Sequence, residues 1–362
     1  MPTKAKVVLF TGAGVGVPLG LPTSTEFVVE MDANARQITK HVRAYLGKDA
    51  DDIEWVLSGL EEFRTQTDFT EYLLPHLAAG NSHAEHGKAH VQRSLTSFRK
   101  EGAQELVRLK KVIFEKLNSY DAAQAVQVHA GLIRSIREAV DGCALSVFTT
   151  NYDLTFEAAA ENGEAVFGEL GIAEIDYGFS MTFGRPIYDP SRDFKWQPTI
   201  IEYLKLHGSL DWHRDAQGRC SRSMSSTVPD DPDQMAILYP GFKGVPEAEP
   251  FISMHGRLNR RLAEADIVVV VGFAFRDSYI NALFENVLRL RRDLKVLYFN
   301  PLPLDKHPSG SVAPRLSSAY AAFAHNGTPL SLNGRPLPIG ELLRTWGASE
   351  SELAPGAEVA GH

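Results

Sequence analysis

Thr149-Thr150-Asn151-Tyr152-Asp153 is the stretch that decides the fold. It follows an apolar run at 144–148 that predicts a buried strand, and it precedes a helical pattern at 154–160. In a parallel α/β sheet, ligands bind outside the carboxyl ends of the strands. The stretch therefore delivers two threonines, an amide and a carboxylate to a ligand-binding edge. Because Asn and Asp also cap helices well, a purely structural cap after a core strand is the competing interpretation.

Four other apolar runs also end in polar or glycine-rich turns. The runs are 7–10, 200–206, 266–271 and 295–299, and the turns are Thr11 to Gly16, His207-Gly208, Gly272 to Asp277, and Asn300-Pro301. Chance explains one or two such turns, whereas five favour an α/β fold with a doubly wound, Rossmann-like parallel sheet and one ligand groove along its edge. The first turn is a weak dinucleotide signal by itself, because its third glycine, Gly16, comes one place early.

A mostly helical insertion is predicted at about 31–140. Glycine becomes rarer there, and apolar residues recur at helical spacing. Within it, His83, His86 and His90 are spaced for one helix face, but no carboxylate completes a known metal pattern, so a solvated face is the preferred interpretation. The insertion would interrupt one domain at 1–345, and the small, acidic residues of 346–362 predict a disordered tail.

Composition excludes several classes of protein. With 362 residues, 44% apolar content and a net charge of −8, the chain has the make-up of a soluble globular protein, without the charge to bind nucleic acid over its whole surface. A local basic cluster, Arg257, Arg260 and Arg261, is interpreted as a solvated helix face. No signal peptide or membrane-spanning run is apparent, so we expect no membrane association.

Cysteine usage points to a reducing, cytoplasmic setting. The chain has two cysteines, Cys143 before a predicted core strand and Cys220 in a predicted polar loop at 215–234. No C-x-x-C pair exists, which excludes a thiolate zinc site and makes a disulfide scaffold implausible.

Taken in order, the motifs resemble those of the SIR2-like branch of the sirtuin superfamily. The matching stretches cover roughly 4–301: Thr11-Gly12-Ala13-Gly14, Asp52-Ile53-Glu54, Thr149 to Asp153, Lys205 to Trp212, Gly272 to Asp277, and Phe299-Asn300-Pro301. Each stretch is short, but the ordered set is specific, chiefly through the Asn151 and His207 motifs. The resemblance implies a Rossmann-like NAD-binding fold with a helical small module.

The resemblance also implies where NAD would bind. Gly12, Ala13 and Gly14 would lie against its phosphates, and Thr149 would join the residues that bind the dinucleotide. Gly272 and Asn300 would line the adenosine end.

The same resemblance implies the catalytic residues. Asn151 and Asp153 would hold the nicotinamide ribose and position the attacking group, and His207 would be the general base. Two positions depart from the family pattern: Ala274 replaces a serine common at its turn, and Tyr152 replaces an aliphatic residue.

Deacylation is disfavoured, because zinc-containing deacylases of the superfamily carry four cysteines after the His-Gly motif, and here only Cys220 follows it. The chain is therefore similar to a zinc-free branch in which NAD is the substrate and water the acceptor. Members of that branch resemble NAD-depleting effectors of bacterial anti-phage defence. The expected activity is an NAD glycohydrolase that yields nicotinamide and linear or cyclic ADP-ribose.

The branch implies partners as well: a homo-oligomer, a HerA-type hexameric ATPase or a short Argonaute, without a membrane and without direct nucleic-acid binding. Two alternatives stay open at this point. The chain could be a non-catalytic subunit that binds NAD or ADP-ribose, or, with less support, a protein deacylase.

Overall fold

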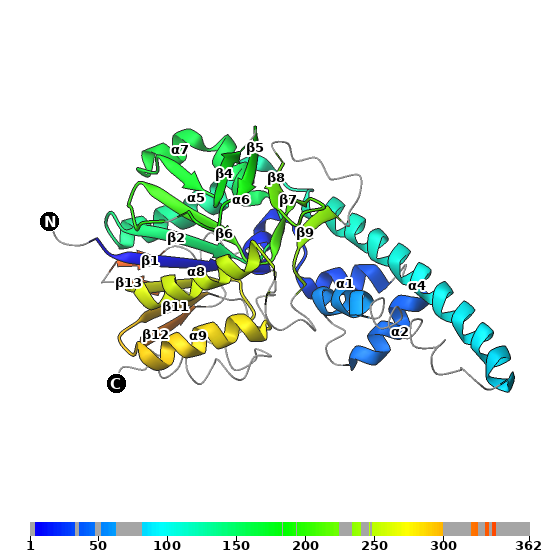
Figure 1. Cartoon of the computed structure of the whole chain (residues 1–362). Helices are drawn as coiled ribbons and strands as arrows, with labels where there is room; N and C mark the ends of the chain where they lie inside the picture. Colours follow the sequence, from blue (N-terminus) through cyan, green and yellow to red (C-terminus); the bar gives the residue numbers. More distant parts are fainter. Residues whose placement is uncertain are drawn as a thin grey trace. The chain divides into compact units, whose positions relative to one another are not determined.

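The computed structural model describes residues 4–32, 36–47, 52–62, 82–182, 184–192, 194–223, 234–239, 246 and 248–299, and three strands further on (Figure 1). The chain forms two compact units. The first comprises residues 1–23, 117–238 and 246–362, and the second comprises 24–116 and 239–245. Asn300 and the expected tail at 346–362 lie outside the described residues.

A seven-stranded parallel sheet forms the centre of the first unit. Its order is β12 (Tyr320–Ala324), β11 (Lys295–Phe299), β10 (Ile267–Val271), β1 (Lys6–Thr11), β2 (Ala144–Thr149), β6 (Ile200–Lys205) and β3 (Glu174–Asp176). All five strands predicted at 7–10, 144–148, 200–206, 266–271 and 295–299 are present. The predicted α/β fold with a Rossmann-like parallel sheet is confirmed.

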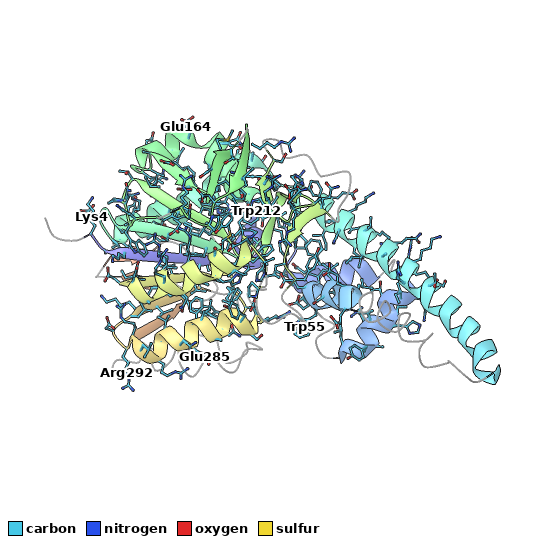
Figure 2. All side chains as sticks on the ribbon, in the orientation of Figure 1. Lys4, Trp55, Glu164, Trp212, Glu285 and Arg292 are labelled. Carbon is cyan, nitrogen blue, oxygen red and sulfur yellow. The ribbon has the colours of Figure 1, made fainter. Side chains whose placement is uncertain are left out.

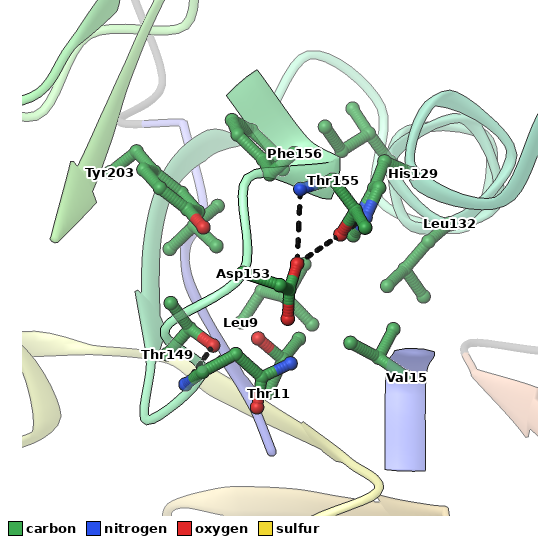
Figure 3. Close-up of a pocket in the computed structure, with 13 residues that line it drawn as sticks. Leu9, Thr11, Val15, His129, Leu132, Thr149, Asp153, Thr155, Phe156 and Tyr203 are labelled. Carbon is green, nitrogen blue, oxygen red and sulfur yellow. Dashed lines mark hydrogen bonds between the residues drawn. The ribbon is translucent and has the colours of Figure 1, made fainter. Parts of the chain in front are cut away.

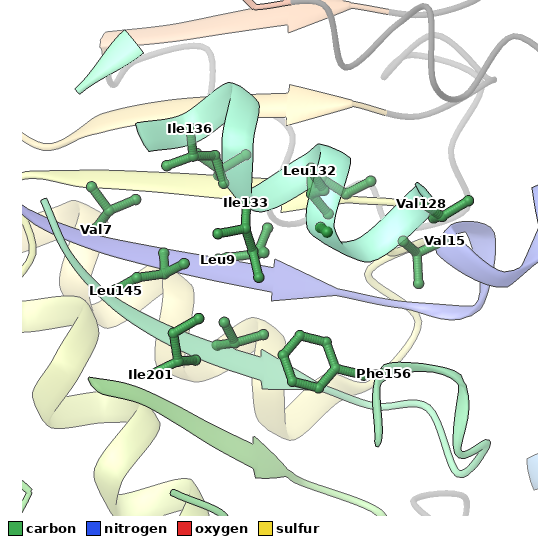
Figure 4. Packing of buried hydrophobic residues seen from close by; sticks show 14 of the residues in the cluster. Val7, Leu9, Val15, Val128, Leu132, Ile133, Ile136, Leu145, Phe156 and Ile201 are labelled. Atoms are coloured by element: carbon green, nitrogen blue, oxygen red, sulfur yellow. The ribbon is translucent and has the colours of Figure 1, made fainter. Parts of the chain in front are cut away.

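Both faces of this sheet are buried, which explains the continuous apolar runs. Val7 and Leu9 of β1 pack with α5 (Ala122–Ala139), α6 (Thr155–Asn162) and α7 (Glu164–Glu169) in one core cluster (Figure 4). Val8 and Phe10 pack with α8 (Phe251–Glu264) and α9 (Ser278–Leu290) in the other. Successive side chains of a strand alternate between its faces, so the four positions 7–10 of β1 are all apolar.

A second, antiparallel sheet of five strands belongs to the same unit. Its order is β4 (Phe179–Thr182), β5 (Arg185–Tyr188), β8 (Cys220–Arg222), β7 (Gly208–Arg214) and β9 (Met235–Ile237). Trp212 of β7, labelled in Figure 2, is buried. Its ring centroid is 5.1 Å from that of Phe179. The polar loop predicted around Cys220 is wrong, because Cys220 is buried in β8. A three-residue strand is too short to show alternation in the sequence.

The prediction that Arg257, Arg260 and Arg261 form a solvated helix face is also wrong in part. Arg260 is exposed, but Arg257 and Arg261 of α8 are buried. Glu202 of β6 accepts from Arg261 Nε at 2.6 Å, and Arg257 lies 3.4 Å from its other oxygen. A buried carboxylate needs such partners, so the arginines turn toward the sheet.

The second unit is helical where the structure describes it. It contains α1 (Ser24–Asp32), α2 (Gln37–Leu46), a helical segment at 53–62 and most of α4 (Ser82–Leu117). The side chains of His83, His86 and His90, for which a solvated face was predicted, are not among those that the structure describes. Helix α5, which falls within the predicted insertion at 31–140, packs on the sheet of the first unit. Among the described helices, none is long and apolar enough to span a membrane. Strands β13 (Leu330–Leu332) and β14 (Arg335–Leu337) form a separate antiparallel pair.

The chain passes from the first sheet to the second at His207-Gly208. Gly208 has a φ of +92°, and a Cβ atom there would lie 2.0 Å from the backbone oxygen of Ala236 in β9. Leu238, directly after β9, donates its N–H to the oxygen of His207 at 2.8 Å. The backbone of this segment fixes the link, so glycine is required directly after His207.

The substitution Gly208→Ala should destabilise the protein strongly. Positive φ costs an alanine about 1–2 kcal/mol, and the collision with backbone adds about 1–3 kcal/mol. Gly218→Ala is the matched control, because Gly218 also has positive φ, +79°, but has no atom within 4 Å of the added Cβ. Denaturant unfolding should show a loss of about 1 kcal/mol for the control and a clearly larger one for Gly208→Ala. Equal losses would contradict the steric argument.

Candidate active site

The strand order reverses between β1 and β10, which is where open α/β folds bind ligands. The backbones meet there at Gly14 and Gly272: a Cβ on Gly14 would lie 2.6 Å from the Cα of Gly272. Gly12 N–H donates to the oxygen of Val271, and Gly14 N–H donates to the oxygen of Gly272, both at 3.0 Å. Gly12, Ala13 and Gly14 thus lie at the predicted edge, and two of their amides are already bonded to the β10 strand and the turn that follows it.

The turn after β2 lies beside this glycine contact. Thr149 ends β2, and its hydroxyl accepts from Asn151 N–H at 3.1 Å. Thr150 N–H donates to the oxygen of Thr11 at 3.2 Å, and Leu206 N–H donates to the oxygen of Thr149 at 2.8 Å. The turn is therefore tied to the strand on each side of it.

A pocket opens between this turn and helix α5 (Figure 3). Polar side chains from four segments line it, and its apolar wall comes from the strands, α5, α6 and the 3-10 helix Ala13–Leu19. The polar residues are Thr11, His129, Thr149, Asn151, Asp153 and Thr155, and the apolar ones are Leu9, Val15, Leu132, Ile133, Val147, Phe156 and Tyr203. Six of the thirteen lining residues are polar, so hydrogen-bonding groups from several segments converge beside an apolar wall.

Within this pocket, Asp153, Thr155 and His129 form a hydrogen-bonded chain. One carboxylate oxygen of Asp153 accepts from Thr155 N–H at 3.0 Å and from the Thr155 hydroxyl at 2.5 Å. His129 Nε2 lies 2.9 Å from that hydroxyl oxygen. Because the hydroxyl proton is given to Asp153, Nε2 must be the protonated nitrogen that donates to Thr155. The second oxygen of Asp153 points away from Thr155, toward Thr11 (Figure 3).

Burial keeps His129 neutral. It lowers the pKa of His129 to about 4, with the Lys205 ammonium acting in the same direction and Asp153 opposing both. A neutral imidazole with Nε2–H fixes the orientation of Thr155, and through it the carboxylate of Asp153.

His207 lies at the same edge of the sheet but does not line this pocket. Thr149 pairs with Lys205, so Asn151 and His207 each come two residues after paired positions on neighbouring strands. The contacts of His207 come from α8 and the start of α9: Nε2 is 2.9 Å from a carboxylate oxygen of Asp277, and its ring is 6.4 Å from that of His255. Its ring is also 6.2 Å from that of Tyr152, the residue between Asn151 and Asp153.

Asp277 serves two elements at once. One oxygen accepts from Ile280 N–H at 2.9 Å and caps α9, and the other contacts His207. Burial alone would raise the pKa of Asp277, but the hydrogen bond and charge of His207 outweigh it and lower this pKa. His255 Nδ1 donates to the Phe251 oxygen at 2.8 Å, and burial, helped by His207, lowers the pKa of His255 to about 4.

The structure thus places the predicted residues in three groups. The pocket is lined by Thr149, Asn151 and Asp153. The close backbone contact between the turns after β1 and β10 is made by Gly12, Gly14 and Gly272, and Ala13 lies in the first of these turns. The third group is His207, which lies against Asp277. Sequence reasoning missed Thr11, His129 and Thr155 as lining residues. Thr155, two positions after Asp153, carried a capping signal, but a single histidine on an apolar helix face carried none.

No group of three or more His, Cys, Asp or Glu residues is placed to hold a metal among the described residues. The two cysteines, Cys143 and Cys220, are both buried. Burial raises the pKa of Cys143 to about 11 and that of Cys220 to about 12.

Residues 145–309 match the family model described as a SIR2-like domain. This segment contains the Asn151 turn, the His207-Gly208 motif and the Gly272 turn. This match supports the resemblance found in the motifs, over a segment that is slightly less than half of the chain.

Several solved structures are similar to this chain. One is a mutant Sir2 homologue in complex with 2′-O-acetyl-ADP-ribose, at 16% identity and a TM-score of 0.46, covering 94% of this chain and 89% of that chain. Another is a Sir2 homologue in complex with NAD, at 16% identity and a TM-score of 0.45, covering 94% and 87%. No curated protein matches the chain.

The neutral histidines predict a loss of stability at mildly acidic pH. The folded pKa of about 4 for His129 and His255 lies below an unfolded value of about 6.5. Between these values the unfolded chain binds more protons, so stability is present above about pH 6.5 and is lost as the pH falls toward 4. Each histidine should contribute on the order of 3 kcal/mol to this loss.

The measurement is the free energy of unfolding at a series of pH values. His129→Gln should reduce the stability lost between pH 6.5 and 4 by on the order of 3 kcal/mol, the share that His129 contributes. His41→Gln, at an exposed position of α2, is the control for replacing a histidine by glutamine. An unchanged slope in His129→Gln would show that His129 is not neutral in the folded protein.

Proposed function

We propose that this protein is an NAD glycohydrolase that cleaves the bond between nicotinamide and ribose. The observation that supports it most is the pocket at the carboxyl ends of β1 and β2, where Asn151, Asp153 and three threonines line one space. The match of residues 145–309 to a SIR2-like domain supports NAD as the molecule bound there.

The chemistry that this reaction needs matches the groups in the pocket. Nicotinamide is cationic while attached and leaves as a neutral ring, so it needs no general acid. The site has to stabilise an oxocarbenium-like ribose and to place a nucleophile. In this proposal the free oxygen of Asp153 supplies negative charge, and the amide of Asn151, which both donates and accepts, holds water and a ribose hydroxyl.

His207 is the proposed general base, and His129 the residue that orients Asp153. A positioned base contributes about 10²–10⁴-fold to such a reaction. His207 Nε2 is 2.9 Å from the carboxylate of Asp277. The ring of His207 also lies near that of Tyr152, which belongs to the same turn as Asn151. His129 acts on Asp153 only through the Thr155 hydroxyl.

Water is the proposed acceptor, which makes the products nicotinamide and ADP-ribose. The chain has two cysteines, so it has no set of four thiolates for the zinc ribbon of the deacylases. Formation of a cyclic product would leave the roles of Asn151 and Asp153 unchanged.

The biological role that we propose is that of an effector in bacterial anti-phage defence, which acts by depleting NAD. An enzyme of this kind has to be inactive in a healthy cell. The proposal therefore includes control by self-assembly or by a separate partner, such as a HerA-type ATPase or a short Argonaute.

Asn151→Ala should lower kcat for nicotinamide release by at least about 10²-fold, because it removes the group that places the nucleophile. Asn162→Ala, at an exposed position of α6, is the matched control and should retain full activity. His207→Ala should lose a comparable factor. Release of nicotinamide from NAD is followed by chromatography; full turnover in Asn151→Ala would remove this site from consideration.

The control proposal predicts low activity for the purified chain and much higher activity with the product of a neighbouring gene. The increase should exceed about tenfold, the change that a coupling free energy of about 1.4 kcal/mol produces. Nicotinamide release and the sedimentation of the protein are measured together, with and without the candidate partner. Equal activity in both samples, with no change in assembly, would contradict control by that partner.

A further inference from the structure

Lys205 carries a buried positive charge directly beneath the Asn151 turn. It is the last residue of β6 and is 1% exposed. Its ammonium lies 3.0 Å from a carboxylate oxygen of Glu157, 2.9 Å from the hydroxyl of Ser209 and 3.4 Å from the backbone oxygen of Tyr152, and it also donates to the backbone oxygen of Asp153. Four acceptors therefore surround a group that has three protons.

These four acceptors come from three different parts of the site. The oxygens of Tyr152 and Asp153 belong to the turn itself, Glu157 belongs to the first turn of α6, and Ser209 follows His207-Gly208 in β7. One ammonium thus joins the segment that presents Asn151 and Asp153 to the segment that carries His207. Rotating either turn peptide would withdraw its oxygen from a buried cation, which is costly.

The pair of Lys205 and Glu157 is poorly explained by stability alone. Burial raises the pKa of Glu157, against the opposing effect of Lys205, and Asp211 nearby raises it further. Asp211 is itself bonded to Arg222 at 2.6 Å. Buried ion pairs contribute little net stability compared with apolar side chains of similar volume, so a role in fixing geometry accounts better for this one.

We propose that Lys205 is the positioning residue of the site: its ammonium holds the peptides of Tyr152 and Asp153 so that the Asn151 and Asp153 side chains face the pocket. This proposal rests on the proposed function as far as catalysis is concerned. Lys205 is not among the residues that line the pocket. It acts through its hydrogen bonds to the turn and to Ser209.

The same strand offers a matched control. Glu202, also on β6, forms a buried pair with Arg261 at 2.6 Å, but this pair contacts the segment around Phe194 and leaves the Asn151 turn untouched. The double variants Lys205→Met/Glu157→Gln and Arg261→Met/Glu202→Gln each remove one buried cation and one buried carboxylate. Removing both Lys205 and Glu157 avoids the unpaired buried charge that a single substitution would leave. The control is the harsher change, because Arg257 loses the Glu202 carboxylate and keeps its hydrogen bond to the Arg192 oxygen.

Two readouts are measured on both double variants and on the wild-type chain. The first is hydrogen–deuterium exchange in peptides covering residues 150–155, whose amides include those of Thr150, Asn151 and Thr155. Exchange there should be at least about tenfold faster in the Lys205/Glu157 variant and unchanged in the control. The second is nicotinamide release, for which kcat should fall by at least about tenfold while KM stays within about threefold.

The outcomes are separable. Slow exchange at 150–155 in the Lys205/Glu157 variant, or equal effects of the two double variants on both readouts, would overturn the positioning role. If the wild-type chain releases no nicotinamide in any setting, the proposed function fails, while the exchange measurement still decides whether Lys205 holds the turn. Thermal melting of each variant shows that it is folded; an unfolded Lys205/Glu157 variant beside a folded control would mean that the pair is needed for folding, and would also overturn the proposal.

Discussion

The parallel pairing of β1 with β2 on one side and β10 on the other is the constraint on which the site depends. Thr11 pairs with both Thr149 and Val271, and Thr149 in turn pairs with Lys205. Four strands therefore end at one level, and the segments that follow them leave from the same edge. Because both faces of the sheet are covered by helices, the strands cannot slip by one residue without exposing a full set of apolar side chains.

Strand β6 shows how this buried sheet tolerates charge. Glu202 meets the arginines of α8, whereas Lys205, of opposite parity along the strand, meets Glu157 of α6. Each charge has a partner and hydrogen bonds, as burial requires. The first pair fixes α8 against the sheet. The second pair, Lys205 with Glu157, contacts the turn that carries Asn151. This costly buried charge therefore lies where the geometry of the turn matters for the proposed reaction.

The two histidines near the turn have different surroundings. His129 is neutral and bonded to the Thr155 hydroxyl, which leaves it a role in orienting Asp153. His207 faces a carboxylate, Asp277, which is fixed as the cap of α9. A carboxylate beside an imidazole favours the protonated ring, which suits a residue that accepts a proton during a reaction. The neighbouring His255 stays neutral, so it adds no competing positive charge.

The sequence by itself determined the parallel sheet, five of its strands and the turn that carries Asn151 and Asp153. Strands buried on both faces have continuous apolar runs, and the turns after them carry residues with strong local preferences, so both features can be read locally. Only the tertiary structure decided that His129 joins the pocket, that Arg257 and Arg261 are buried, and that Lys205 lies under the turn. These contacts join residues 26 to 59 positions apart, and no local periodicity encodes such pairings. For a polar residue on a helix or at a strand end, the local sequence does not distinguish a side chain that faces water from one that faces a buried partner.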